Sequence, residues 1–180
     1  MSYYVFVDNS NVWIEGKYVS AVNKGYAPNI FAAHNNYCQD DAWTIDFGRL
    51  LYTVTETNIS DIADAVLFGS KPTDKDSLWD AMRKVGFEVV NLPRNAANKE
   101  KKIDTGLVSR ILQTLYTKAK EGDIFVLVMG DSDYVPVMQQ ISEKKIKTIV
   151  AFWSHVSGEL KEAADVFIDL TTCIDSITLA

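Results

Sequence analysis

The chain has 180 residues, of which 47% are apolar and 23% are charged, and its net charge is −6. This composition is typical of a folded globular domain and excludes a disordered chain. The acidic balance argues against a general nucleic-acid coat, because such coats bind by neutralising phosphates, and leaves a local basic patch or bound metal ions as the ways to hold a polyanion.

Apolar runs alternate along the chain with segments of helical spacing. In chain order, the pattern predicts strands at 3–7, 65–68, 87–92, 124–129 and 148–152, and helices at 47–55, 77–85, 105–118, 134–143 and 158–164. Near-continuous apolar runs, rather than strict apolar–polar alternation, are typical of strands covered on both faces. We therefore expect an α/β fold with a mostly parallel central sheet and helices on both of its faces.

One segment interrupts this alternation. Residues 20–43 contain Gly25, Pro28 and four asparagines without a clear period, and we interpret them as a loop insertion. A long irregular loop in a compact domain is usually functional or mobile. No linker, internal repeat or low-complexity tract divides the chain, so we predict a single domain over residues 1–180.

Carboxylates follow two of the predicted strands. The strand at 3–7 leads directly into Asp8, and the strand at 124–129 is followed by Asp131 and Asp133. A third candidate, Asp104, opens the helix at 105–118. Because ligands bind beyond the carboxyl ends of strands in an open parallel sheet, we expect these four aspartates at one edge of the sheet.

Each aspartate alone has an ordinary structural role as a turn former or helix N-cap. Their joint placement points to a cation, because two ionised carboxylates about 4 Å apart repel by roughly 4 kcal/mol at an effective dielectric near 20. An all-oxygen ligand set without His or Cys favours Mg²⁺ or Mn²⁺ over zinc. Such cations usually assist phosphoryl transfer or phosphodiester hydrolysis.

Several segments resemble one family, in the right order along the chain. Val5-Phe6-Val7-Asp8-Asn9-Ser10-Asn11 resembles the opening of NYN domains, the PIN-like nuclease relatives that include the LabA-like proteins. Lys101-Lys102-Ile103-Asp104 resembles their central Lys-x-x-Asp element. Gly130-Asp131-Ser132-Asp133-Tyr134-Val135-Pro136 is similar to their Gly-Asp-Ser-Asp-Phe-x-Pro segment and is the most specific match. The resemblance extends from residue 3 to about residue 170, where a closing helix and edge strand are expected, and 20–43 is the main unmatched piece.

The resemblance implies a Rossmann-like PIN domain with a metal-dependent ribonuclease centre for single-stranded RNA. Its catalytic and metal-binding residues would be Asp8, Asp104, Asp131 and Asp133, with one or two Mg²⁺ or Mn²⁺ ions. Residues expected to bind the substrate are Asn9, Asn11, Ser132, Arg94, Lys101 and Lys102. The two asparagines have an equal alternative role in capping a helix that starts near Val12. The basic residues fall in a predicted loop before Asp104, for which a solvated surface is the alternative.

The chief alternative function is a catalytically weak or inactive RNA- or protein-binding module of the same fold. Many members of the family carry another acidic residue about two turns after the Asp104 equivalent, where this chain has Arg110, and this difference favours the alternative. A phosphatase with an aspartyl intermediate would need an aspartate where Ser10 stands, and the motifs of serine hydrolases and P-loop enzymes are absent. The sequence is also compatible with a protein partner or a homo-oligomer.

The remaining candidates are histidines, tryptophans and cysteines. His34 and His155 are far apart in the sequence and in predicted loops without zinc-ligand spacing, and His155 follows a strand that ends at the expected cleft. Trp13, Trp43 and Trp153 are candidates for stacking on bases, although most tryptophans are core residues. Two cysteines are too few for a disulfide scaffold or a four-cysteine zinc site and indicate reduced thiols in a cytoplasmic protein. The longest apolar run is too short to cross a bilayer, and the N-terminus lacks the pattern of a secretory signal, so we expect no membrane association.

Overall fold

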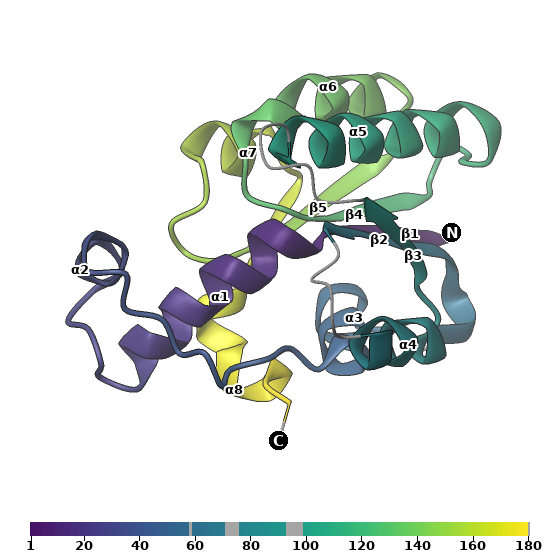
Figure 1. Ribbon diagram of the computed structural model, residues 1–180. Helices are drawn as coiled ribbons and strands as arrows, with labels where there is room; N and C mark the ends of the chain where they lie inside the picture. The colour runs from purple at the N-terminus through teal and green to yellow at the C-terminus, as the bar shows by residue number, and fades with distance from the viewer. Residues whose placement is uncertain (58, 71–75, 93–98, 180) are drawn as a thin grey trace.

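A six-stranded parallel sheet forms the centre of the computed structural model, which describes residues 1–57, 59–70, 76–92 and 99–179 (Figure 1). The strand order is β3-β2-β1-β4-β5-β6, and all neighbouring strands are parallel. The strands are β1 (Tyr3–Asp8), β2 (Ile62–Ser70), β3 (Glu88–Leu92), β4 (Ile124–Val128), β5 (Lys147–Phe152) and β6 (Val166–Asp169). The expected α/β fold with a mostly parallel sheet is therefore confirmed.

Helices cover both faces of this sheet (Figure 1). They are α1 (Asn9–Asn23), α2 (Ile30–Asn35), α3 (Phe47–Thr55), α4 (Asp76–Val85), α5 (Lys99–Thr117), α6 (Val135–Glu143), α7 (Gly158–Ala163) and α8 (Ile174–Ile177). Short 3₁₀ turns lie at Ile59–Asp61, Ser132–Tyr134 and Leu170–Cys173. None of the helices in the described residues is long and apolar enough to cross a membrane.

Two hydrophobic cores lie on opposite faces of the sheet, because successive strand residues point to opposite sides. In β1, Val5 and Val7 belong to the core formed with α1, α3, α4 and α8, whereas Tyr4 and Phe6 belong to the core formed with α5, α6 and α7. The strands are buried on both sides, which explains why their sequences are continuous apolar runs rather than alternating ones.

The strand order places a topological switch point between β1 and β4. The chain passes from β1 outward to β2 and β3, and then returns to β4 on the other side of β1. The loops that leave the carboxyl ends of β1 and β4 therefore diverge to opposite sides, and a crevice forms there in sheets of this kind. Asp8 ends β1, and Asp131 follows β4 by a short connection, so both predicted residues lie at this switch point.

The insertion predicted at residues 20–43 is more ordered than expected. Helix α1 continues to Asn23, and a further helix, α2, lies inside the segment. The two ends of the segment are joined by the buried Asp40, which accepts hydrogen bonds from Ser20 Oγ at 2.6 Å and pairs with Lys24 Nζ at 2.6 Å. The apolar residues of α2 are too few for the sequence pattern to distinguish them from a loop.

The helix expected at 105–118 begins six residues earlier, at Lys99. Asp104 therefore lies within α5 rather than at its start, and the backbone of Lys101 and Lys102 is helical rather than part of a loop. The side chains of Lys101 and Lys102, and all of Arg94, lie outside the described residues. The run of charged residues before Asp104 has no apolar stripe, so hydrophobic periodicity does not predict the first turn of α5.

Candidate functional site

Asp8 is the most buried of the predicted acidic residues. It ends β1 and is the N-cap of α1, where its Oδ1 accepts a hydrogen bond from the backbone N–H of Asn11 at 3.1 Å. Its side chain is only 5% exposed, although the residue carries an ionisable group. Its pKa is raised to about 6, chiefly by burial and also by the charges of Asp104 and Asp131, while the hydrogen bonds from the Asn11 N–H and the Tyr134 hydroxyl oppose this rise.

Tyr134 connects Asp8 to Asp104. Its hydroxyl oxygen lies 3.2 Å from Asp8 Oδ2 and 3.3 Å from Asp104 Oδ1, so the single hydroxyl proton is shared between two acceptors. The side chain is fully buried, and burial together with the two carboxylate charges raises the pKa of Tyr134 far above its usual value. Tyr134 therefore stays protonated and acts as a donor between the two carboxylates.

The turn after β4 carries Asp131 and Asp133. Asp131 is exposed and caps the 3₁₀ turn by accepting the backbone N–H of Asp133 at 3.2 Å, while its charge acts on Asp8. The turn packs closely on β5, since a Cβ on Gly130 would lie 2.1 Å from Cε1 of Phe152. Any side chain at position 130 would therefore displace the acidic turn from the end of β5.

The donor set at this edge fits a hard divalent cation. Three carboxylates are close enough to raise the pKa of one of them, and a cation would relieve that repulsion. Two further oxygens, Asn9 Oδ1 and Asn11 Oδ1, are buried and have no hydrogen-bond partner. The ligands available at the switch point are oxygens, which Mg²⁺ and Mn²⁺ prefer.

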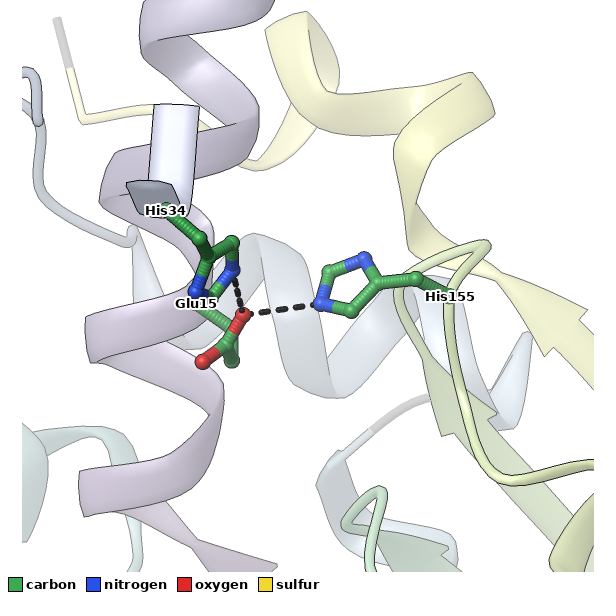
Figure 2. Close-up of side chains that lie close together, drawn as sticks. All are labelled: Glu15, His34 and His155. Carbon is green, nitrogen blue, oxygen red and sulfur yellow. Dashed lines mark hydrogen bonds and ion pairs between the residues drawn. The ribbon is translucent and has the colours of Figure 1, made fainter. Parts of the chain in front are cut away.

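A second group of side chains lies beside this acidic edge, and the sequence did not predict it. Glu15 Oε2 lies 2.9 Å from His34 Nε2 and 2.8 Å from His155 Nε2 (Figure 2). In the described part of the chain, it is these three residues, and no set of the predicted aspartates, whose possible ligand atoms all lie within 4.8 Å of one another. We call them the His–Glu–His cluster.

A pocket joins the two groups. It has a volume of about 270 Å³ and is lined by Asn11, Gly130, Asp131, Ser132, Phe152, Ser157 and the three residues of the His–Glu–His cluster. Of the residues predicted to bind substrate, Asn11 and Ser132 thus line this pocket, and Asn9 is buried beside Asp8. His155 lines it as expected, but His34 belongs to helix α2 and not to a loop.

Arg110 lies away from the site, and two of the candidate tryptophans are buried. The Arg110 guanidinium pairs with Asp64, at 3.3 Å, and with Glu88, both near the amino ends of their strands and therefore at the opposite edge of the sheet. Trp43 and Trp153 are buried core residues whose rings meet edge to face at 5.7 Å, so of the two roles open to them the structure favours the core role over stacking on bases.

Comparison with known proteins identifies the family. The sequence model of the NYN domain matches residues 4–172, which is nearly the whole chain. The chain belongs to the NYN domain family, which has a PIN-like nuclease fold, generally acts on RNA and typically uses a divalent metal. No match was found among curated proteins.

One solved structure shows the same fold. It is the crystal structure of VPA0982, a protein of unknown function from Vibrio parahaemolyticus RIMD 2210633, with a TM-score of 0.71 and 19% sequence identity. The alignment covers 99% of this chain and 96% of that chain. The elements match over nearly the full length of both chains, so the fold predicted from the sequence is shared with this structure.

Proposed function

We propose that the chain is a metal-dependent ribonuclease that hydrolyses phosphodiester bonds of single-stranded RNA, acting as a single domain in the cytoplasm. The observation that carries the proposal is the convergence of the Asp8, Asp104 and Asp131 charges at the switch point of the sheet. Membership of the NYN family supports a nuclease.

Asp8, Asp104, Asp131 and Asp133 would hold one or two Mg²⁺ or Mn²⁺ ions. Such an ion, when bound, lowers the pKa of water and neutralises charge on the phosphate. Tyr134 positions two of the ligands, because its hydroxyl donates to either Asp8 or Asp104 and limits how far the two carboxylates can separate. Burial and the neighbouring carboxylates raise the pKa of Asp8, so a cation bound here would stabilise its ionised form.

The substrate phosphate would lie in the pocket beside Asp131. Asn11 and Ser132 line this pocket and carry neutral polar groups that can donate hydrogen bonds to a phosphodiester. We also assign Asn9 to the substrate site, because its buried amide oxygen has no hydrogen-bond partner among the described residues and can accept a hydrogen bond from a water molecule and orient it. Arg94, Lys101 and Lys102 would hold flanking phosphates of the RNA.

The first test is cleavage of a labelled single-stranded RNA by the Asp131→Asn variant in the presence of Mg²⁺ or Mn²⁺. Asparagine retains the oxygen that caps the turn at Asp133, but it removes the negative charge. We expect the cleavage rate to fall by at least about 100-fold, which corresponds to about 3 kcal/mol of transition-state stabilisation. Asp61→Asn is the matched control, since Asp61 is an exposed aspartate just before the amino end of β2, and it should cleave at the wild-type rate. Wild-type activity in Asp131→Asn, in protein free of contaminating nucleases, would show that the centre lies elsewhere.

The second test addresses the basic residues. Replacing both Lys101 and Lys102 by glutamine should weaken RNA binding and reduce the slope of log affinity against log salt by about 1.4, since each phosphate contact contributes about 0.7 for a single strand. The measurement is a fluorescence-anisotropy titration at several salt concentrations. An unchanged slope would exclude these two lysines from the RNA interface.

The alternative, an RNA- or protein-binding module with weak or no catalysis, is favoured by one observation. The Tyr134 hydroxyl lies within hydrogen-bond distance of one oxygen of Asp8 and one of Asp104, where the family motif has a phenylalanine, so besides positioning these carboxylates it competes with a cation for their oxygens. Wild-type protein that binds RNA but fails to cleave it with either Mg²⁺ or Mn²⁺ would select this alternative.

A further inference from the structure

The His–Glu–His cluster is assembled from three separate parts of the chain. Glu15 lies on α1, His34 on α2 within the insertion, and His155 follows β5 (Figure 2). Both imidazole rings direct their Nε2 atoms to the same carboxylate oxygen, Glu15 Oε2. The cluster therefore brings two nitrogen donors and one oxygen donor close together.

The geometry is close to that of a three-ligand metal site. Bonds from zinc to imidazole nitrogen and carboxylate oxygen are about 2.0–2.2 Å long, so neighbouring ligand atoms around a tetrahedral ion lie roughly 3.4 Å apart. In the structure, the oxygen lies 2.9 and 2.8 Å from the two nitrogens, and all three atoms lie within 4.8 Å. Each oxygen–nitrogen distance would have to lengthen by about half an ångström, through a movement of the glutamate side chain, for an ion to be bound by all three residues.

The rings are held in place by packing rather than by the glutamate alone. His34 stacks on Tyr18 with ring centroids 4.1 Å apart, and His155 meets Phe152 edge to face at 6.1 Å. Tyr18 is buried, and it lies three residues after Glu15 on the same helix face. The site is thus pre-organised, which lowers the entropic cost of binding an ion.

We propose that Glu15, His34 and His155 bind a divalent transition-metal ion, with zinc as the expected occupant. Two imidazoles and one carboxylate suit zinc and its neighbours in the first row, whereas Mg²⁺ selects oxygen ligands and prefers the acidic edge. The site does not depend on the proposed ribonuclease activity, since none of its ligands belongs to the acidic centre.

The fourth position of this ion faces the shared pocket. Sites with three protein ligands keep an open position for water or an exogenous ligand, unlike closed structural sites with four. All three cluster residues line the pocket that also contains Asp131 and Ser132. An anionic oxygen ligand such as phosphate can therefore reach the ion from the same side on which it would reach the acidic edge.

The insertion would supply one of the three metal ligands. Helix α2 contributes only one polar side chain to the pocket, His34, and without the insertion the cluster would have two ligands instead of three. Outer-shell changes already reduce metal affinity by about 10–100-fold, so loss of this ligand should reduce it by more than about 100-fold.

The test uses Co²⁺ as a spectroscopic substitute for zinc in the full chain without a histidine tag. Wild-type protein should bind one equivalent of Co²⁺ with the visible absorption of a four- or five-coordinate ion, excess Mg²⁺ should leave it bound, and zinc should displace it. Inorganic phosphate should change the spectrum, because it enters the open position. His34→Gln and His155→Gln should lose the absorption, with circular dichroism and thermal unfolding to verify that both variants fold.

Further variants distinguish this site from the acidic centre and from the two cysteines as the source of the absorption. Asp131→Asn should retain the Co²⁺ absorption, and His155→Gln should still bind Mn²⁺ at the acidic centre, so that failure of either proposal is recognised separately. The double variant Cys38→Ser, Cys173→Ser should also retain the absorption, since the two free thiols are the competing soft ligands. Absence of the absorption in the wild type, its persistence in His155→Gln or its loss in the cysteine variant would overturn the proposal, and a spectrum insensitive to phosphate would overturn the open position.

Discussion

Two groups of ionisable side chains lie at one pocket, which Asp131 of the acidic centre and all three residues of the His–Glu–His cluster line, and they are built in different ways. The acidic centre is formed by Asp8 and Asp131 after the two central strands and by Asp104 on α5. The His–Glu–His cluster uses α1, the inserted helix α2 and the segment after β5. Asp8 is almost completely buried, whereas the cluster residues are partly exposed.

The difference shows which of the two groups the sheet itself positions and which one depends on additional structure. Any chain with this strand order brings the ends of β1 and β4 together, so carboxylates placed there converge without additional structure. The cluster needs a helix that the sheet does not require. Additional ligands can therefore be introduced beside the same architecture by lengthening a connection, without altering the sheet.

The largest expected effect on stability follows from the burial of Asp8. Its pKa in the folded chain, about 6, is above the ordinary value of 3.8, so its contribution to stability is fully present below pH 3.8 and is lost as the pH rises through about 6. In metal-free protein, Asp8→Asn should therefore raise the free energy of unfolding at about pH 8 by up to about 3 kcal/mol, with no gain at about pH 3. Asparagine is also an effective N-cap, so α1 is preserved.

Urea unfolding of both proteins across this pH range, with EDTA present, measures the effect. Saturating Mn²⁺ should then stabilise the wild type more than Asp8→Asn, because the variant has lost the buried charge that a cation at the acidic centre would neutralise. If the free energies of unfolding of the two proteins change in parallel with pH, burial does not raise the pKa of Asp8. The contrast between a buried acidic centre and an accessible cluster would then be removed.

A smaller effect is expected for Tyr134→Phe. The ring and its packing remain, but the hydroxyl that bonds to Asp8 and Asp104 is removed, which should cost about 1 kcal/mol in metal-free protein. Since that hydrogen bond lowers the pKa of Asp8, the variant should titrate Asp8 at a higher pH. Carboxyl ¹³C chemical shifts followed against pH measure this directly, and an unmoved Asp8 midpoint would contradict the bridging role.

The smallest effect on function is expected for Arg110→Met. Arg110 pairs with Asp64 and Glu88 at the amino edge of the sheet, and methionine preserves part of its apolar packing. RNA cleavage should stay within about 2-fold of the wild type, while the free energy of unfolding falls by about 1 kcal/mol or less. A large loss of cleavage with unchanged stability would show that the site is not confined to the carboxyl edge.

Five of the six strands and most of the helices could be predicted from the sequence pattern, because the central strands are buried on both faces and the amphipathic helices have clear apolar stripes. Helix α3 was predicted with its observed bounds, Phe47–Thr55. The start of α5 and the whole of α2 could not be predicted. The first turn of α5 is a run of charged residues, and α2 has six residues and buries only Ala33 completely.

The acidic centre and the His–Glu–His cluster also differ in how far the sequence predicts them. Asp8 and Asp131 were found because their position after strands predicts their position in space. Glu15, His34 and His155 are separated by 19 and 121 residues, and their meeting depends on where an insertion folds back, which no local pattern records. The one available signal was the position of His155 at the end of a strand.

The hydrogen bond between Ser20 and Asp40 bears on which part of the insertion can be replaced. Because it ties the two ends of the insertion together, the residues between them form a closed unit whose replacement leaves the ends where they are. Closing a connection of another length across the same two points changes the chain entropy only slightly. Residues 21–39 are thus the part of the chain that can be replaced with the least effect on the sheet and its carboxylates, although the replacement would remove the donor that His34 supplies.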